Sequence, residues 1–409
     1  MNAAVSNSWR PTKLKFTGRV VAGGTPESGN PHYWDGTVPW LTPVDLGNER
    51  NDTITASKRT LTEAGVRAAG LERLPIGSVV FSSRAPIGSV GLLACEAVTN
   101  QGCKALVPDS RELDSRFGFY LALNSTETLQ SLGLGTTFTE LSTYALKNLA
   151  VSLPSPAEQR RIAGYLDEAT GKVDRLVALR RRQMELLREQ RAALIQQAVT
   201  RGLNPNAPLK DSGLPWLGQI PKHWKVAVLK WQMQIASGDS VLTEALLPDP
   251  DGVSNIPAIG GNGVMGYTAR SNVSSPMLAI GRVGALCGNV HYVPPPAWIT
   301  DNALMAFGVR GYSLEFLWRL LTVLNLNRLA NQNAQPLITG TLVKNQRAPL
   351  PPLEEQREIL EFIEAESAKI DRILSAYTRQ LELLMEYRAA LIHESVTGQR
   401  AVSAPEARA

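Results

Sequence analysis

The sequence predicts a mixed α/β protein: two α+β domains separated by two long antiparallel helices, with a pseudo-two-fold internal repeat. Residues 153–200 align without a gap on residues 350–397, and 22 of the 48 positions are identical. Each copy opens with prolines and then runs about 45 residues without another, which indicates a long helix. The regions outside the copies are rich in glycine and turn residues and contain short β-branched runs. Two copies of one domain-and-helix unit account for all three observations.

Residues 1–152 form the first predicted domain. The runs SVVF (78–81), VGLLA (90–94) and KALVP (104–108) have the composition of strands. The segment LDSRFGFYLALN (113–124) indicates a helix. Strands and helices therefore alternate irregularly, as in an α+β domain.

Residues 153–207 form the first predicted spacer helix and its linker. Apolar residues follow the 4,3 spacing of a paired helix at Ile162, Leu166, Ala169, Val173 and Leu176. At 1.5 Å per residue such a helix spans on the order of 65 Å, more than a globular domain needs, so its predicted task is separation. The Pro- and Gly-rich segment 201–224 ends it.

Residues 208–349 form the second predicted domain, and residues 350–400 form the second spacer helix. That helix repeats the apolar spacing at Ile359, Ile363, Ile370 and Ile373, so the two helices are expected to pair with each other. The two domains also resemble each other weakly: Trp9, Leu14, Lys15 and Gly23 match Trp224, Leu229, Lys230 and Gly238, and Arg84 beside a glycine matches Arg282 beside Gly284. We interpret them as diverged copies of one fold.

Composition limits the class of protein. Hydrophobic residues make up 44% and charged residues 19% of the chain, which suits packed globular domains. The net charge of +5 permits an anionic partner such as nucleic acid without demanding one. Three cysteines without close pairing fit buried thiols in a reducing compartment. With no signal peptide and no apolar run of membrane-spanning length, a cytoplasmic protein without a membrane partner is expected.

None of the motifs that suggest catalysis has the neighbouring residues that its chemistry needs. GNGVMG (261–266) fits a dinucleotide-binding pattern, but the following YTARSNVSSP cannot form the helix that would hold a pyrophosphate. NPHY (30–33) resembles the adenine-gripping element of methyltransferases, yet no glycine-rich cofactor loop precedes it, and a turn is the better interpretation. The P-loop, zinc-protease and serine-hydrolase signatures are missing, and the four histidines lack metal-ligand spacing. The prediction is a protein without catalytic residues, cofactor or metal.

The polar loops instead have the chemistry of recognition. GGTP (23–26), PWLTPVD (39–45), SKR (57–59), SSRAPIG (82–88), GGNG (260–263), GRVG (281–284) and TDN (300–302) combine glycines, hydroxyls, amides and single cations. Arginine can read guanine and asparagine adenine, while hydroxyls, lysines and backbone amides hold phosphates. In the alternative interpretation, the glycines and Trp40 only shape loops and fill the core.

The chain as a whole resembles the specificity subunit of type I restriction-modification systems. The resemblance rests on GGTPES, NPHYWDG, PWLTPVDL and SRAPIGSVG in the first half and on GGNGVMGY, IGRVGALCGNVHY and TDNAL in the second. LPSPAEQRRI and LPPLEEQREI, which open the two helices, are its most specific elements, and LKDSGLPWLGQIPKHW is a further one. The first half departs from the family pattern because it has no equivalent of PWLGQIPKHW.

This resemblance implies a DNA-recognition subunit that is not itself an enzyme. Residues 1–152 and 208–349 would be target-recognition domains, each reading one half of a bipartite double-stranded DNA site. The helices would set the spacing and dock two methylation subunits, and restriction (motor-nuclease) subunits would join the complex. The residues expected at the DNA are Gly24, Thr25, Trp40, Thr42, Lys58, Arg59, Ser83, Arg84 and Gly88 in the first domain and Gly261, Asn262, Arg282, Gly284, Thr300 and Asn302 in the second.

Two other functions remain open from the residues alone. A coiled-coil adaptor that binds proteins and no DNA would fit the modest net charge. A self-contained methyltransferase is less well supported, because both of its signature loops are missing.

Overall fold

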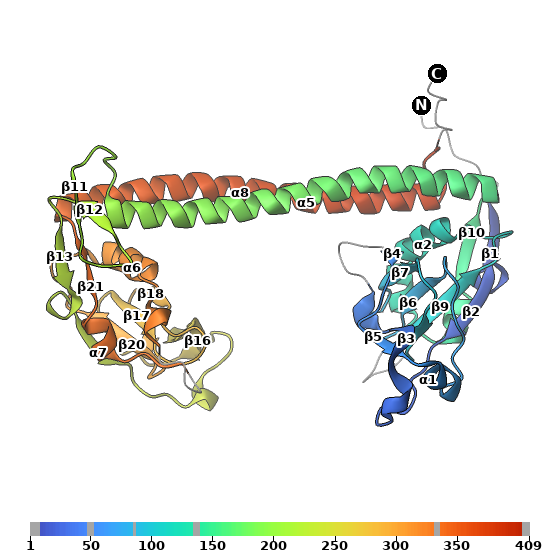
Figure 1. Ribbon diagram of the computed structural model, residues 1–409, viewed down its shortest axis with the longest axis horizontal. Coiled ribbons are helices and arrows are strands. Elements are labelled where there is room, and N and C mark those ends of the chain that lie inside the picture. The colour runs from blue at the N-terminus through green and yellow to red at the C-terminus, as the bar shows by residue number, and fades with distance from the viewer. Residues whose placement is uncertain (1–8, 47–52, 85–86, 134–139, 331–335, 403–409) are drawn as a thin grey trace, which may run out of the picture. The chain divides into compact units, whose positions relative to one another are not determined.

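The computed structural model describes residues 9–46, 53–84, 87–133, 140–330 and 336–402. It divides into two compact units, and Figure 1 shows their elements. Unit 1 contains Met1–Arg180 and Arg379–Ala409, and unit 2 contains Arg181–Thr378. Each unit therefore combines one globular region with one end of each long helix.

Unit 1 is built on a five-stranded sheet with a smaller three-stranded sheet beside it. The order of the first is β2 (Gly18–Ala22), β9 (Cys103–Pro108), β6 (Val79–Ser82), β7 (Val90–Leu93) and β4 (Thr53–Ile54); that of the second is β5 (Arg59–Leu61), β3 (Trp34–Leu41) and β8 (Val98–Thr99). Neighbouring strands are antiparallel except β4 with β7 and β3 with β8. β1 (Arg10–Lys13) pairs with β10 (Ala150–Leu153).

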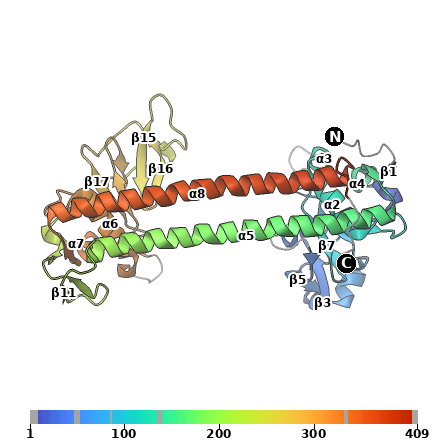
Figure 2. The ribbon, with the colours of Figure 1, turned by 90° about the horizontal axis from the view of Figure 1, so that it is seen from above.

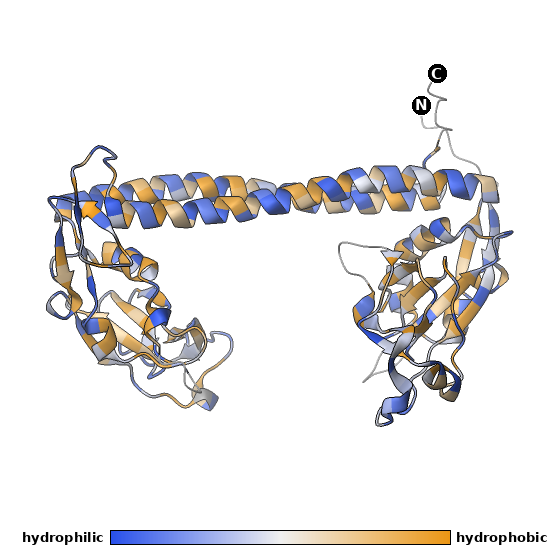
Figure 3. Cartoon of the chain, viewed as in Figure 1, coloured by the Kyte–Doolittle hydropathy of each residue, from blue (hydrophilic) through white to orange (hydrophobic). Residues whose placement is uncertain are grey.

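The short helices of unit 1 pack against both of its sheets. They are α1 (Glu63–Ala68), α2 (Ser115–Asn124), α3 (Thr126–Ser131) and α4 (Thr143–Lys147), with 3-10 turns at Leu14–Phe16, Pro31–Tyr33 and Pro43–Asp45. In α2 the buried Phe117 and Tyr120 join Phe81 of the sheet and Ile162 and Leu166 of the long helix in one core. Figure 3 shows the apolar residues gathered on the sheet strands.

Unit 2 repeats this plan with a four-stranded sheet. Its order is β14 (Gln234–Ser237), β20 (Ala303–Phe307), β17 (Met277–Gly281) and β18 (Val290–Val293), all antiparallel, beside a second sheet of β16 (Gly263–Thr268), β15 (Ile256–Gly260) and β19 (Trp298–Ile299). Two pairs complete it: β11 (Leu209–Asp211) with β12 (Gln219–Pro221), and β13 (Lys225–Val228) with β21 (Arg347–Leu350). The helices are α6 (Leu314–Val323) and α7 (Gly340–Lys344), with 3-10 turns at Leu229–Trp231, Thr243–Ala245 and Leu326–Leu329.

The hydrogen bonds show that the two units share one fold. Leu14 N–H donates to Leu149 O at 3.0 Å in unit 1, and Leu229 N–H donates to Gln346 O at 2.9 Å in unit 2. At Gly23 and Gly238, a Cβ would collide with the backbone carbonyls of the facing strand in both units. The expected matches of Leu14 with Leu229 and of Gly23 with Gly238 are thereby confirmed.

The long helices are α5 (Pro156–Arg201) and α8 (Leu353–Val396), and in each unit their ends run antiparallel (Figure 2). In unit 1 Arg388 pairs with Asp174 at 2.9 Å, and in unit 2 Arg191 pairs with Asp371 at 2.7 Å. Arg191 and Arg388 each open a copy of RAALI. The repeated motif therefore makes the same cross-helix ion pair once in each unit.

The predicted apolar stripe holds over most of both helices but not at one repeated position. Ile162, Leu166, Ile359 and Ile363 are buried as expected. Leu176 and its counterpart Ile373, however, expose 49% and 41% of their surface, so the apolar spacing does not predict burial at this repeated position. Among the described residues, no helix is both long and apolar enough to cross a membrane.

One glutamine fastens the start of each long helix to its unit. The Gln159 side chain donates to Glu112 O and Pro154 O at 2.9 and 3.0 Å and accepts from Asp114 N at 2.8 Å. The Gln356 side chain repeats this with Gly311 O, Pro351 O and Ser313 N, at 2.8, 2.9 and 2.8 Å. Asp114 and Ser313 are the N-caps of α2 and α6. This explains the glutamine in LPSPAEQRRI and LPPLEEQREI.

Candidate nucleic-acid interface

In unit 1, two exposed cations lie where a bend at Lys58 leads into β5, which begins at Arg59. The Arg59 guanidinium lies 3.8 Å from the ring centre of Trp34 and 5.4 Å from that of Trp40. The Asp45 carboxylate accepts from the Thr42 backbone at 2.8 Å and from Lys58 N at 3.0 Å. Stacking between an arginine and an aromatic ring orients the guanidinium plane. Lys58 and Arg59 are thus exposed, and contacts with Asp45 and Trp34 fix the Lys58 backbone and the Arg59 guanidinium.

The buried Trp40 lies next to Arg59 on the inner side of the unit. It is 4% exposed, and its indole N–H donates to Gly24 O at 3.0 Å. Trp40 therefore connects the GGTP and SKR loops and serves as a scaffold for Arg59, as the alternative interpretation of Trp40 expects.

A second polar group of unit 1 centres on Glu140. Its carboxylate lies 3.3 Å from Arg84 Nε and 3.4 Å from Lys104 Nζ, and the Lys104 side chain is only 6% exposed. Beside it, the Thr25 hydroxyl bonds the Gln101 side chain. Burial raises the pKa of the neighbouring Cys103 thiol to about 12, so this thiol stays protonated.

Two further expected residues of unit 1 lie inside the fold. The Ser83 side chain is buried and its hydroxyl donates to Gln101 O at 3.4 Å. Gly88 is buried at a φ of +91°, a conformation that favours glycine. Ala85 and Pro86 of the SSRAPIG loop lie outside the described residues.

In unit 2 the polar group gathers around Arg282. Its Nη1 donates to the Ser237 hydroxyl at 3.2 Å, and its backbone N–H donates to Asn302 O at 2.9 Å. Asn289 Nδ2 donates to Asn262 Oδ1 at 3.4 Å. The buried Thr300 faces Met265 Sδ at 3.9 Å, so its hydroxyl points into the unit.

The glycines of unit 2 allow its loops to meet. A Cβ on Gly281 would collide with the carbonyl of Gly261, so the two loops touch backbone to backbone. Gly284 has a φ of +85°, and its N–H donates to Pro336 O at 3.0 Å. Both Gly261 and Gly284 therefore shape the loops that carry Asn262 and Arg282.

The expected match of Arg84 with Arg282 is wrong by one residue. In backbone hydrogen bonding Arg282 takes the position of Ser83, and Arg84 corresponds to Val283. The matching bonds run from Ser83 N to Gly102 O, from Leu141 N to Ser83 O, from Arg282 N to Asn302 O and from Ile338 N to Arg282 O, all at 2.8 or 2.9 Å. The isolated bridges Arg84 with Glu140 and Val283 with Leu337 agree with this register. Loops of different length hid it from a comparison of sequences.

Sequence reasoning also missed several participants. Glu140, Gln101, Trp34, Ser237 and Asn289 each contact an expected residue, and Lys104 pairs with Glu140. Only Lys104 had a signal, because a lysine inside the apolar run KALVP calls for a buried partner. Gln101 and Asn289 lie on loops whose meeting points depend on strand register.

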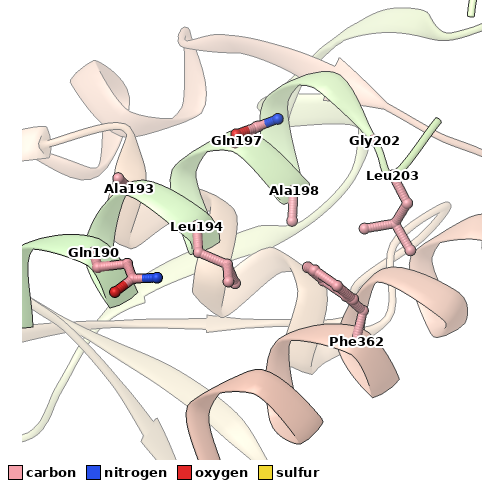
Figure 4. Close-up of a pocket in the computed structure, with 8 residues that line it drawn as sticks. All are labelled: Gln190, Ala193, Leu194, Gln197, Ala198, Gly202, Leu203 and Phe362. Carbon is pink, nitrogen blue, oxygen red and sulfur yellow. The ribbon is translucent and has the colours of Figure 1, made fainter. Parts of the chain in front are cut away.

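The long helices contribute a different kind of surface. In unit 2 a cavity of about 350 Å³ lies between the end of α5 and the start of α8 (Figure 4), lined by Gln190, Ala193, Leu194, Gln197, Ala198, Gly202, Leu203 and Phe362. In unit 1 Tyr165 takes the place of Phe362 in the repeat, and its hydroxyl accepts from Arg400, which also pairs with Glu394 at 2.8 Å. The unit 2 cavity is lined without a charged side chain, unlike the loops.

Comparison with known proteins agrees with this architecture. The family model of the type I restriction modification DNA specificity domain matches residues 8–183 and 252–383. The chain belongs to this family. The resemblance drawn from the sequence motifs is thereby confirmed.

Two curated relatives of this specificity family differ in coverage. The MjaIX specificity subunit of Methanocaldococcus jannaschii is 31% identical over 242 residues, which are 58% of this chain and 54% of the relative. The chain thus matches about half the length of that relative. The EcoprrI specificity subunit of Escherichia coli is 24% identical over 392 residues, 91% of this chain and 90% of the relative.

Solved structures share the fold of this specificity family. A chain from a study of complex assembly and conformational transition in the type I R-M system has a TM-score of 0.73 at 18% identity, with 97% of this chain and 99% of that chain covered. The HsdS subunit from Thermoanaerobacter tengcongensis has a TM-score of 0.51 at 18% identity, with 97% and 98% covered. The predicted fold of two α+β domains with two long antiparallel helices is confirmed.

Proposed function

We propose that the chain is the DNA sequence-specificity subunit of a type I restriction-modification complex, with each unit reading one half of a bipartite site. One observation carries this proposal: a single fold is built twice, and equivalent backbone positions hold different polar side chains, such as Ser83 and Arg282. Different side chains on one scaffold suit two different half-sites. The exposed Lys58, Arg59, Arg84 and Asn262 and the partly exposed Arg282 are the proposed contacts.

The buried residues of the expected set have a supporting role in this proposal. Trp40, Ser83, Gly88 and Thr300 lie inside the units and shape the loops. Gly24, Thr25, Thr42, Gly261, Gly284 and Asn302 are partly exposed, and their backbone groups remain proposed phosphate contacts. The domain limits 1–152, 153–207, 208–349 and 350–400 also remain proposals.

The helices are proposed to set the spacing of the half-sites and to dock two methylation subunits, which restriction subunits then join. The arginine of each RAALI copy pairs with an aspartate of the facing helix, so the same helix contact recurs in both units. Two identical partners could each bind one of these equivalent surfaces, which supports the proposal. Exposed apolar side chains also support docking, namely Leu176, Leu179, Leu383 and Met385 in unit 1 and Leu186, Phe362 and Ile373 in unit 2. The chain itself is proposed to be non-catalytic and cytoplasmic, where its three unpaired thiols stay reduced.

Methylation mapping tests the proposal. The full chain is expressed with its methylation subunits in a host without other adenine methylation, and methylated adenines are mapped by long-read sequencing. We expect one bipartite motif with a constant gap. Methyl transfer by the purified chain alone, or a complex that binds no DNA in gel shifts, would contradict the proposal, and the second result would favour a protein adaptor.

A further inference from the structure

Arg282 and Ser83 occupy one backbone position, yet they present opposite surfaces. In unit 1 the Ser83 hydroxyl is buried against Gln101 O at 3.4 Å. In unit 2 the partly exposed Arg282 extends to the Ser237 hydroxyl at 3.2 Å, and Ser237 is itself exposed. The shared scaffold thus projects a guanidinium from unit 2 where unit 1 has a short buried side chain.

The guanidinium of Arg282 keeps most of its donors for a ligand. Arginine carries five N–H donors in a planar fork. Within the described ranges, the Ser237 hydroxyl is the side-chain partner found for Arg282, and no carboxylate lies within ion-pair distance of it. The segment 331–335, which lies outside those ranges, reads NQNAQ and contains no acidic residue. Arg282 therefore differs from Arg84, whose charge Glu140 partly neutralises.

The surroundings of Arg282 favour a base over a phosphate. The close packing of Gly261 on Gly281 brings the Asn262 loop beside the start of the Arg282 loop, and Asn262 bonds Asn289. The polar side chains described around Arg282 are thus two amides and the Ser237 hydroxyl. Phosphates accept hydrogen bonds from arginines, hydroxyls and amides without regard to sequence, whereas an oriented arginine fork with side-chain amides near it also matches the donor and acceptor pattern of base edges in the major groove.

We propose that Arg282 is a specificity-determining residue of unit 2 and reads a guanine through its O6 and N7 atoms. The bond to Ser237 orients the guanidinium for this contact. This inference rests on the proposed function. Because Ser83 stands at the same position in unit 1, the half-site of unit 1 is read through other residues, and the two halves of the site differ in sequence.

The test uses the full chain assembled with its methylation subunits. The variants are Arg282→Ser, which introduces the unit 1 residue, Arg282→Lys, which keeps the charge and removes the fork, and Arg310→Ala as the control. Arg310 is exposed and lies just after the C-terminal end of β20. Arg282 lies just after β17, and the end of β17 pairs with the start of β20. The two arginines therefore lie near opposite ends of β20. Binding is measured on duplexes that carry each base pair in turn at every position of the site, and methylated sites are mapped in parallel.

We expect Arg282→Ser and Arg282→Lys to lose about ten- to hundred-fold discrimination for G·C at one position of one half-site. The other half-site should stay unchanged in both variants and serves as the internal measure of folding. Arg310→Ala should keep the wild-type site. An active Arg282→Ser complex with the wild-type preference would overturn the inference, as would a loss of affinity that is equal for every base pair. A wild-type complex without any bipartite site would instead refute the proposed function itself.

Discussion

At the scale of single residues, Lys104 shows how unit 1 holds a buried charge. Its ammonium group lies 3.4 Å from Glu140, and its side chain is 6% exposed. By backbone hydrogen bonding its counterpart in unit 2 is Leu304, since Gly23 N donates to Cys103 O and Gly238 N to Ala303 O. One unit therefore places a paired charge where the other has a buried leucine.

Glu140→Ala should destabilise unit 1 by about 1–3 kcal/mol, because it leaves a buried ammonium group without its partner. Adding Lys104→Leu, the residue of unit 2, should restore most of the loss, since a buried pair can often be replaced by an apolar side chain at little cost. Urea unfolding of the full chain measures both effects. A double variant as unstable as Glu140→Ala alone would show that Glu140 stabilises the unit by a contact other than Lys104.

Gly164→Ala should stabilise the start of α5 by about 0.5–1 kcal/mol, since glycine is less favourable than alanine inside a helix. A Cβ at Gly164 would meet no atom within 4 Å. Gly202→Ala is the matched control and should destabilise, because Gly202 has a φ of +74° and faces Trp224. Thermal unfolding followed by circular dichroism distinguishes them, and a lower melting temperature for Gly164→Ala would contradict the prediction.

At the scale of elements, the junction between helix and globular unit is the most faithfully repeated feature. Gln159 and Gln356 are both fully buried, and each makes three hydrogen bonds to backbone atoms. Those bonds join the first turn of the long helix to the N-cap of α2 or α6. This side chain therefore helps to fix the orientation of each helix end, together with the apolar residues that pack against the same unit.

Gln159→Leu should loosen unit 1 and leave unit 2 intact, while Gln356→Leu should do the reverse. Each substitution removes three hydrogen bonds to backbone groups, one of them buried, so a loss of about 2–4 kcal/mol is expected. Hydrogen exchange measured by mass spectrometry should show faster exchange at residues 112–118 in the first variant and 311–317 in the second. Arg160→Leu, an exposed position next to Gln159, is the control and should change neither segment. Equal protection in all variants would refute the role of the glutamines.

At the scale of the whole molecule, the pseudo-two-fold repeat lets one chain act as a dimer. The ion pairs Arg388 with Asp174 and Arg191 with Asp371 are the same contact in two units. Two identical partner subunits could then bind equivalent surfaces. The proposed function assigns the helices a further task, which is to set the gap between the half-sites.

A paired insertion tests this task. Four helix-forming residues are added after Leu187 and four after Ser375, each four positions from the ion pair of Arg191 and Asp371. The insertion lengthens the helices by about 6 Å and nearly preserves their facing, so the preferred gap should grow by about one or two base pairs. Methylation mapping reads the gap directly. An active complex with an unaltered gap would show that the helices do not set it, and a two-residue insertion, which rotates the apolar stripe, should prevent assembly.

The features that could be predicted from sequence are those that depend on neighbouring residues and those that recur in the internal repeat. The 4,3 spacing and the absence of proline determined both long helices, because helix periodicity depends on neighbours three and four residues apart. Identity between the copies predicted the internal repeat, and the family resemblance predicted the antiparallel direction of the helix pair. The family resemblance followed from the motifs at the helix starts, where Gln159 and Gln356 make their bonds.

The tertiary structure alone decided which loops meet and which side chains remain exposed. Arg282 corresponds to Ser83 only through strand register, and Lys104 reaches Glu140 across 36 positions of sequence. Leu176 fits the apolar stripe by spacing but remains exposed. Such contacts arise from hydrogen bonding and packing between segments far apart in the chain, so a local sequence pattern does not predict them.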